Sequence, residues 1–132
     1  MPTDTPPTPT GLIWAGWIVT GLVVLFLVFD GVMKVVRATP AVEATAKLGV
    51  PDDAVVPIGL ILLAVTAIYA APPTAVLGAV LLTGYLGGAA AIHLRADSGA
   101  FPVAFSVGFA VLAWAGLVLR EPRLFWTILL RQ

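Results

Sequence analysis

Long uncharged and apolar segments alternate with short polar connections along this chain. No charged side chain lies between Asp53 and His93, and Pro72-Pro73 divides that stretch near its middle. Two further uncharged runs extend from Thr5 to Phe29 and from Ser98 to Leu119. The hydrocarbon core of a bilayer is about 30 Å thick and needs ~20 helical residues at ~1.5 Å each. The pattern therefore predicts four membrane-spanning helices, at about residues 12–36, 54–71, 74–92 and 101–119.

The connections between these segments are short, so neighbouring spans must run antiparallel. We expect an all-α fold, an integral membrane four-helix transmembrane bundle over residues 12–121. Residues 1–11 are rich in proline and threonine and have no apolar surface to bury, which predicts a disordered tail. A short helix at about residues 40–48, capped by Thr39, is expected between the first two spans. Residues 122–132 are too short to cross and have basic ends, which predicts an interfacial amphipathic tail.

Composition supports a membrane protein and excludes several function classes. Hydrophobic residues make up 60% of the 132 residues and charged residues only 11%, which lies outside the range of soluble domains. The formal net charge is zero, so we expect the lipid bilayer and no nucleic acid as a partner. Cysteine is absent, which excludes disulfides, thiolate metal sites and thiol redox chemistry in this chain.

An even number of crossings places both termini on one side of the membrane, here called side A, together with the Pro72-Pro73 turn. The other two connections lie on the opposite side, side B. All four tryptophans fall toward side A, as expected for an aromatic belt at the lipid headgroups. Arginine and lysine divide three to four between sides A and B, so the positive-inside rule leaves the absolute orientation open.

The candidate site is a polar cluster of Asp30, Lys34, His93 and Arg95. Asp30 and Lys34 are one helical turn apart in the first span, and Asp30 and His93 each lie ~27 Å along their helices, near the side-B boundary. These groups would meet if the first and third spans pack together. Two interpretations are open: the charges simply extend to the headgroups, or they bind the polar head of a quinone or lipid or relay protons.

Small residues recur along the third span, with Gly84 and Gly88 four residues apart. This spacing lets helix backbones approach closely. We expect these glycines to pack inside the bundle, and the alternative is a contact between copies in a homo-oligomer.

The sequence shows no catalytic constellation. It contains no nucleophile with a neighbouring base, no paired carboxylates and no phosphate-binding glycine loop. His93 is the only histidine, which excludes bis-histidine haem ligation within one chain, and we expect no metal site. We expect no resident cofactor, with a quinone as the alternative.

The segment from Pro72 to Arg95, which reads PPTAVLGAVLLTGYLGGAAAIHLR, resembles the DoxX-like family of small bacterial membrane proteins. Shorter similar pieces are FDGVMK at 29–34, LGVP at 48–51 and GLVLR at 116–120. The resemblance implies a four-span bundle whose recurring polar positions are Asp30, Lys34, His93 and Arg95. The family's namesake is associated with a thiosulfate:quinone oxidoreductase. This chain departs from the family pattern at Leu62, where a glutamate is expected, and at Pro73, where a basic residue is expected.

Three functions remain open from the sequence. The first is a non-catalytic integral membrane subunit or accessory protein of a respiratory or redox-protective complex in the bacterial cytoplasmic membrane. Leu62 favours it, because a buried membrane acid is missing there. The second is a quinone-reactive oxidoreductase subunit, and the third is a membrane-resident chaperone or lipophile carrier.

Overall fold

The computed structural model describes residues 10–124 and Thr127, and it is helical almost throughout those residues. The long helices are α1 (Thr10–Val35), α3 (Val55–Ala70), α4 (Ala75–Arg95) and α5 (Ala100–Arg120). Short 3-10 helices, η1 (Asp52–Ala54) and η2 (Pro72–Thr74), precede α3 and α4. The remaining helices are α2 (Thr39–Lys47) and α6 (Pro122–Leu124). Four segments are long and apolar enough to cross a bilayer, which confirms the predicted all-α membrane bundle.

Several element boundaries differ from the prediction. Helix α1 begins at Thr10, inside the expected tail, and residues 1–9 lie outside the described part of the chain. Helix α4 continues to Arg95, three residues past the expected end, so His93 belongs to the helix. Thr39 is the first residue of α2 and not its cap; Ala38 takes that position and forms no side-chain cap bond. Of the tail expected at 122–132, only α6 and Thr127 are described.

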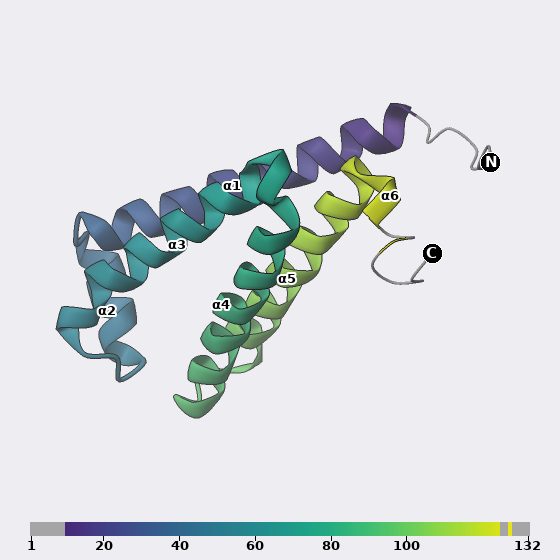
Figure 1. Ribbon diagram of the computed structural model, residues 1–132. Coiled ribbons are helices and arrows are strands. Elements are labelled where there is room, and N and C mark those ends of the chain that lie inside the picture. The colour runs from purple at the N-terminus through teal and green to yellow at the C-terminus, as the bar shows by residue number, and fades with distance from the viewer. Residues whose placement is uncertain (1–9, 125–126, 128–132) are drawn as a thin grey trace.

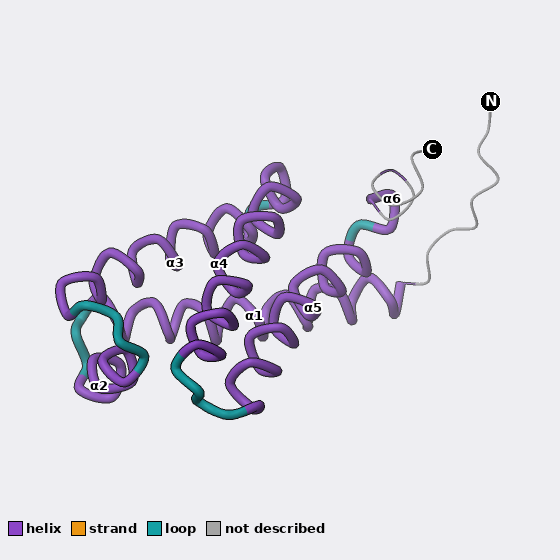
Figure 2. The backbone as a smooth tube through the Cα atoms, turned by 90° about the horizontal axis from the view of Figure 1, so that it is seen from below, coloured by secondary structure: helices purple, strands orange, loops and turns teal. Residues whose placement is uncertain are grey.

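The long helices form two pairs that meet at one end and diverge at the other. Helices α1 and α3 lie side by side, as do α4 and α5, and the pairs come together near the η2 turn (Figure 1). Helix α1 also packs against α5, and α3 against α4. The view from below shows the same two pairs, with α2 beyond the diverging end (Figure 2). Helices α1 and α4 are therefore diagonal partners, so the direct packing of the first and third spans, which was the condition for the polar groups to meet, is not present.

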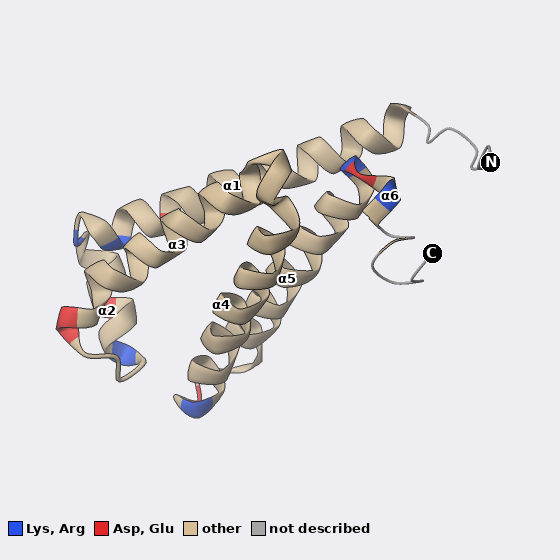
Figure 3. Ribbon diagram, in the orientation of Figure 1, with Lys and Arg blue, Asp and Glu red and all other residues tan. Residues whose placement is uncertain are grey.

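Charged residues of the described chain gather at the ends of the helices. Figure 3 shows them around α2 and the start of α3, at the tip between α4 and α5, and beside α6. At the opposite end of the bundle, three helix ends meet: the start of α1, the end of α3 and the end of α5. Arg120 of α5 donates a hydrogen bond there to the Tyr69 carbonyl of α3. A Cβ at Gly16 of α1 would also overlap the Arg120 backbone. These contacts lie at side A, where an even number of crossings predicts that the first span begins and the fourth span ends.

Glycines allow the helix backbones to approach closely within the bundle. A Cβ built at Gly59 of α3 would lie 2.8 Å from the Gly31 carbonyl oxygen of α1. One at Gly116 of α5 would lie 2.7 Å from the Thr20 hydroxyl oxygen of α1. One at Gly78 of α4 would overlap the Tyr69 backbone of α3. Such close approach is the main way helices gain packing energy where lipid surrounds them, since lipid tails are as apolar as the side chains.

Gly84 and Gly88 do not take part in these contacts. Both are exposed, and a Cβ at either position would meet no atom of the chain within 4 Å. The expectation that they pack inside the bundle is therefore wrong for the single chain. The glycines that do pack belong to four different helices, so no spacing along one span marks them.

The turn between α3 and α4 follows from its prolines. Ala71 has an extended backbone, with ψ of 121°, because the residue before a proline is disfavoured in helical conformation. Pro72 and Pro73 then occupy the first turn of the next helical segment, where a missing N–H costs nothing. The Thr74 hydroxyl donates to the Ile68 carbonyl at 2.8 Å, which satisfies one free acceptor at the end of α3.

Candidate functional site

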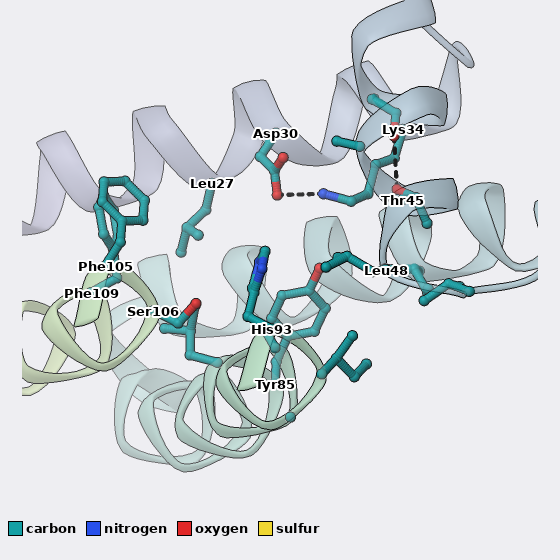
Figure 4. A pocket seen from close by; sticks show the side chains of 18 of the residues that line it. Leu27, Asp30, Lys34, Thr45, Leu48, Tyr85, His93, Phe105, Ser106 and Phe109 are labelled. Atoms are coloured by element: carbon teal, nitrogen blue, oxygen red, sulfur yellow. Dashed lines mark hydrogen bonds and ion pairs between the residues drawn. The ribbon is translucent and has the colours of Figure 1, made fainter. Parts of the chain in front are cut away.

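A cavity of about 450 Å³ lies at the side-B end of the bundle, where the two helix pairs diverge. Four of the longer helices and α2 contribute to its wall, and Figure 4 shows most of the side chains that line it. Its apolar part is formed by rings and aliphatic groups of α1, α3, α4 and α5, among them Phe26, Leu27, Ile58, Leu86, Phe105 and Phe109. Its polar part is formed by Asp30, Lys34, Thr45, Tyr85, His93 and Ser106. The cavity is therefore amphipathic.

Asp30 and Lys34 form an ion pair on the wall that α1 supplies. The Lys34 Nζ donates to the Asp30 carboxylate at 2.6 Å, across one turn of the helix. The Lys34 side chain is only 15% exposed, whereas that of Asp30 is 38% exposed. Lys34 is held inward because its Cβ packs against Gly59 of α3, where a Cβ would lie 2.7 Å away. The pair brings a carboxylate and an ammonium group into the cavity with no net charge.

His93 and Tyr85 reach the same space from α4. Both side chains point from α4 toward the Asp30–Lys34 pair (Figure 4). The His93 Nδ1 atom is buried and has no hydrogen-bond partner in the described part of the chain. A buried polar atom without a partner costs free energy that a ligand or a water molecule can recover. The structure thus brings Asp30, Lys34 and His93 together although α1 and α4 do not pack directly.

Arg95 is not part of this group. It is the last residue of α4, it is exposed, and it does not line the cavity. At two residues beyond His93, its side chain leaves the helix on a different face, since successive helical residues are rotated by roughly 100°. The predicted cluster of four therefore reduces to three residues.

The short helix α2 covers the side-B end of the cavity. Its inner residues Ala41, Ala44 and Thr45 line the cavity, as does Leu48 just after it. An ion pair joins the two ends of this segment: the Arg37 guanidinium donates to both oxygens of the Asp52 carboxylate at 2.8 Å. Arg37 and Gly49 have positive φ angles of 55° and 77°, which turn the chain sharply on either side of α2.

Sequence reasoning missed Tyr85, Thr45 and Ser106 as cavity residues. The spacing of Tyr85, two turns before His93 on the same helix face, was the available signal. No sequence signal marked Thr45 or Ser106, because they lie on α2 and α5, whereas the predicted cluster lies on α1 and α4. Both hydroxyls donate to carbonyls of their own helices, Thr45 to Ala41 at 2.8 Å and Ser106 to Pro102 at 3.1 Å. Their free lone pairs can still accept a hydrogen bond from a ligand.

A second polar cluster lies at the side-A end, away from the cavity. Arg120 is only 5% exposed, and its guanidinium stands 4.9 Å from the Trp17 ring centroid and 5.1 Å from that of Tyr69. Its Nη2 donates to the Tyr69 carbonyl at 3.0 Å. This cluster ties α1, α3 and α5 together.

The polar groups of the cavity can bind a ligand through hydrogen bonds. No group of three or more histidine, cysteine or acidic side chains converges on one point in the part of the chain that the structure describes. The cavity offers hydrogen-bond donors at Lys34 and Tyr85, a free ring nitrogen at His93 and acceptors at Asp30. Such a set can hold the polar head of a molecule whose remainder lies among the aromatic rings.

Comparison with known proteins identifies the family. No curated protein and no solved structure matches the chain. The model of the DoxX-like family matches residues 18–116, which include α1 from its third turn, α2, α3, α4 and most of α5. The match covers the ion pair of α1, the His93 end of α4 and every other residue that lines the cavity. Since it extends over well more than half of the sequence, this membrane protein belongs to the DoxX-like family.

Proposed function

We propose that this DoxX-like protein is a non-catalytic integral membrane subunit that holds a lipophile in the side-B cavity. We place it in a respiratory or redox-protective complex of the bacterial cytoplasmic membrane. The observation that carries the proposal is the amphipathic cavity of about 450 Å³, with Asp30, Lys34 and His93 at its polar end. Ligand cavities of this size commonly have mostly apolar walls and a few convergent polar groups.

The polar groups support binding rather than reaction. The Thr45 and Ser106 hydroxyls donate their hydrogen bonds to carbonyls of their own helices. The Asp30 carboxylate is already paired, because it accepts a hydrogen bond from the Lys34 Nζ at 2.6 Å. The fully buried Leu62 occupies the position where a carboxylate was expected, so the core of α3 supplies no proton acceptor there. The alternative of free charges that only extend to the headgroups explains neither the inward ion pair nor the unpartnered His93 nitrogen.

A quinone-reactive subunit is the second candidate, and the unpartnered His93 Nδ1 atom favours it. When protonated, this atom donates a hydrogen bond to a quinone carbonyl, and Lys34 supplies a second donor on the opposite wall. The phenylalanine rings of α1 and α5 would then pack against the quinone ring. This candidate differs from the first by requiring electron transfer from a partner protein.

The test is extraction of the protein from its native membrane in polymer nanodiscs, followed by native mass spectrometry of bound lipophiles and partner chains. Ala89 lines the cavity and Ala91, on the same helix, is exposed and does not line it. We expect Ala89→Phe to lose the bound lipophile and Ala91→Phe to retain it. Wild-type protein that carries no lipophile, or equal retention by both variants, would contradict the proposal. A bound quinone that the partner complex reduces would favour the second candidate.

A further inference from the structure

Along one flank of the cavity, helix α4 carries two glycines, which have no side chains. Gly84 and Gly88 are one turn apart on α4, both line the cavity and both are exposed. A Cβ at either position would meet no atom within 4 Å. Helices α3 and α4 touch where Gly78 meets Tyr69 and separate from there toward side B (Figure 1). The flank along Gly84 and Gly88 therefore faces the space between two membrane-spanning helices, at the depth of the hydrocarbon core.

At two other boundaries of the cavity, side chains stand where α4 has only glycine. On the α1–α5 seam, the ring centroids of Phe26 and Phe109 are 4.6 Å apart and those of Phe105 and Phe109 are 4.8 Å apart. At the side-B end, Thr45 and Leu48 cover the cavity from α2 and the residue after it. The ion pair between the Arg37 Nη2 atom and both Asp52 carboxylate oxygens joins the two ends of that segment. A molecule that arrives from the bilayer meets least obstruction beside the two glycines.

The charges around the cavity balance one another. Asp30 and Lys34 are paired at 2.6 Å. Among the described residues that line the cavity, no other is a lysine, arginine, aspartate or glutamate. An anionic head would have to leave water without a free cation to compensate it and would lie close to the Asp30 carboxylate. A neutral head with hydrogen-bonding oxygens avoids that cost and can use Lys34, Tyr85 and His93.

We propose that the cavity is loaded sideways from the bilayer, between α3 and α4 past Gly84 and Gly88, by a lipophile with a neutral hydrogen-bonding head and a hydrocarbon chain. The head lies against the Asp30–Lys34 pair, and the chain occupies the gap left by the two glycines and extends into lipid. This inference rests on the proposed function and adds the access route and the charge of the head.

Two amphiphiles with the same oleoyl chain test the head. Monoolein has a neutral glycerol head, and oleoyl lysophosphatidate has an anionic one. Protein in nanodiscs is mixed with donor vesicles that contain one of the two, and occupancy is followed over time by native mass spectrometry. We expect monoolein to bind at least about tenfold more tightly, a difference of about 1.4 kcal/mol. Equal or tighter binding of lysophosphatidate would overturn the assignment of a neutral head.

Three leucine substitutions on α4 test the route. Gly84→Leu and Gly88→Leu place side chains in the gap, whereas Gly87→Leu is a matched control. Gly87 is also exposed and also free of neighbours within 4 Å, but it does not line the cavity. We expect the first two variants to slow monoolein loading by about tenfold or more, because access becomes the limiting step, and the control to load like wild type.

The outcomes separate this inference from the proposed function. If the wild type binds monoolein and all three variants load at the same rate, the route between α3 and α4 is wrong while the proposed function stands. If Gly84→Leu changes the oligomer size in size-exclusion chromatography and leaves loading unchanged, the glycines form a contact between copies and the route is again wrong. If the wild type binds neither amphiphile and carries no native lipophile, both proposals fail.

Discussion

The phenol of Tyr69 on α3 donates a hydrogen bond of 2.6 Å to the backbone carbonyl of Ala113 on α5. Tyr69 is 0% exposed, and the bond crosses the bundle between two helices that do not follow each other in the chain. In a bilayer, a buried hydroxyl has no water to bond, so its only favourable partner is another group of the protein. This bond, with Arg120 beside it, fixes the end at which the helix pairs meet.

We therefore predict that Tyr69→Phe lowers the free energy of unfolding by about 0.6–1.7 kcal/mol, the range found for interhelical hydrogen bonds in membranes. The measurement is thermal or denaturant unfolding in a mild detergent. Tyr85→Phe is the matched control, because the Tyr85 hydroxyl lines the cavity instead of joining two helices. A stability loss that is equal in the two variants would contradict the role of the Tyr69 bond.

Arg120→Lys should also destabilise the side-A end. The planar guanidinium lies against the rings of Trp17 and Tyr69 and donates to the Tyr69 carbonyl, and an ammonium group cannot keep that stacked geometry. We expect a loss of about 1–2 kcal/mol, as for a partly desolvated cation–π contact. Melting temperatures in detergent report it, with Arg123→Lys at the exposed Arg123 as the control. An unchanged melting temperature for Arg120→Lys would show that a positive charge at this position is sufficient for the stability of the side-A end.

Gly78→Ala should disrupt the contact between α3 and α4. The added methyl group would overlap the Tyr69 backbone, and a backbone cannot turn away as a flexible side chain can. We expect a cost of about 1–3 kcal/mol, the range for overpacked sites. Gly87→Ala should be neutral or stabilising, because it meets no atom within 4 Å and alanine favours a helix over glycine by roughly 1 kcal/mol. Comparing the two variants by unfolding in detergent checks the prediction, and equal stabilities would refute it.

Asp52→Asn should loosen α2 without unfolding the bundle. The substitution weakens the ion pair with Arg37 that joins the two ends of the α2 segment. Both partners are exposed, so we expect a change of only about 0.2–1 kcal/mol, which salt reduces further. Hydrogen exchange of residues 39–47 should become faster at low salt, whereas exchange in α3 should not change. The neighbouring Asp53→Asn is the control, and faster exchange in both variants would assign the effect to lost charge and not to the pair.

Labelling of single cysteines should confirm the crossing number, since the native chain has no cysteine. A cysteine placed at Thr3 and another placed at Ser98 should react with a membrane-impermeant maleimide from opposite faces of the membrane. Ser98 lies in the connection between α4 and α5, at the side-B end. Reaction of both from the same face would contradict four crossings.

The sequence predicted most of the fold because the bilayer imposes strict rules. A segment that crosses hydrocarbon must be apolar, long enough and helical, and each of these properties can be read from local composition. The proline pair at 72 and 73 also predicted the turn locally, because the residue before a proline is disfavoured in helical conformation. The candidate site was partly predictable, since Asp30, Lys34 and His93 are polar groups near the end of apolar spans and such groups are costly in lipid.

The remaining site residues depended on how the helices associate. Arg95 was wrongly included because depth in the membrane does not determine the face of the helix on which a side chain lies. Tyr85, Thr45 and Ser106 were missed because they lie on three different helices and share only the cavity that they line. Gly84 and Gly88 were assigned to packing by their spacing, yet Gly16, Gly31, Gly59, Gly78 and Gly116 make the close helix contacts.

The amino-acid sequence alone determined that the chain is a four-span helical membrane protein with its charges at the membrane borders, because transfer of each segment from water to lipid depends only on that segment. The tertiary structure alone decided that the helix pairs diverge at side B, that an amphipathic cavity opens there, and that Arg120 lies inside at side A. Those properties depend on which helix faces approach one another, and packing between distant segments selects those faces.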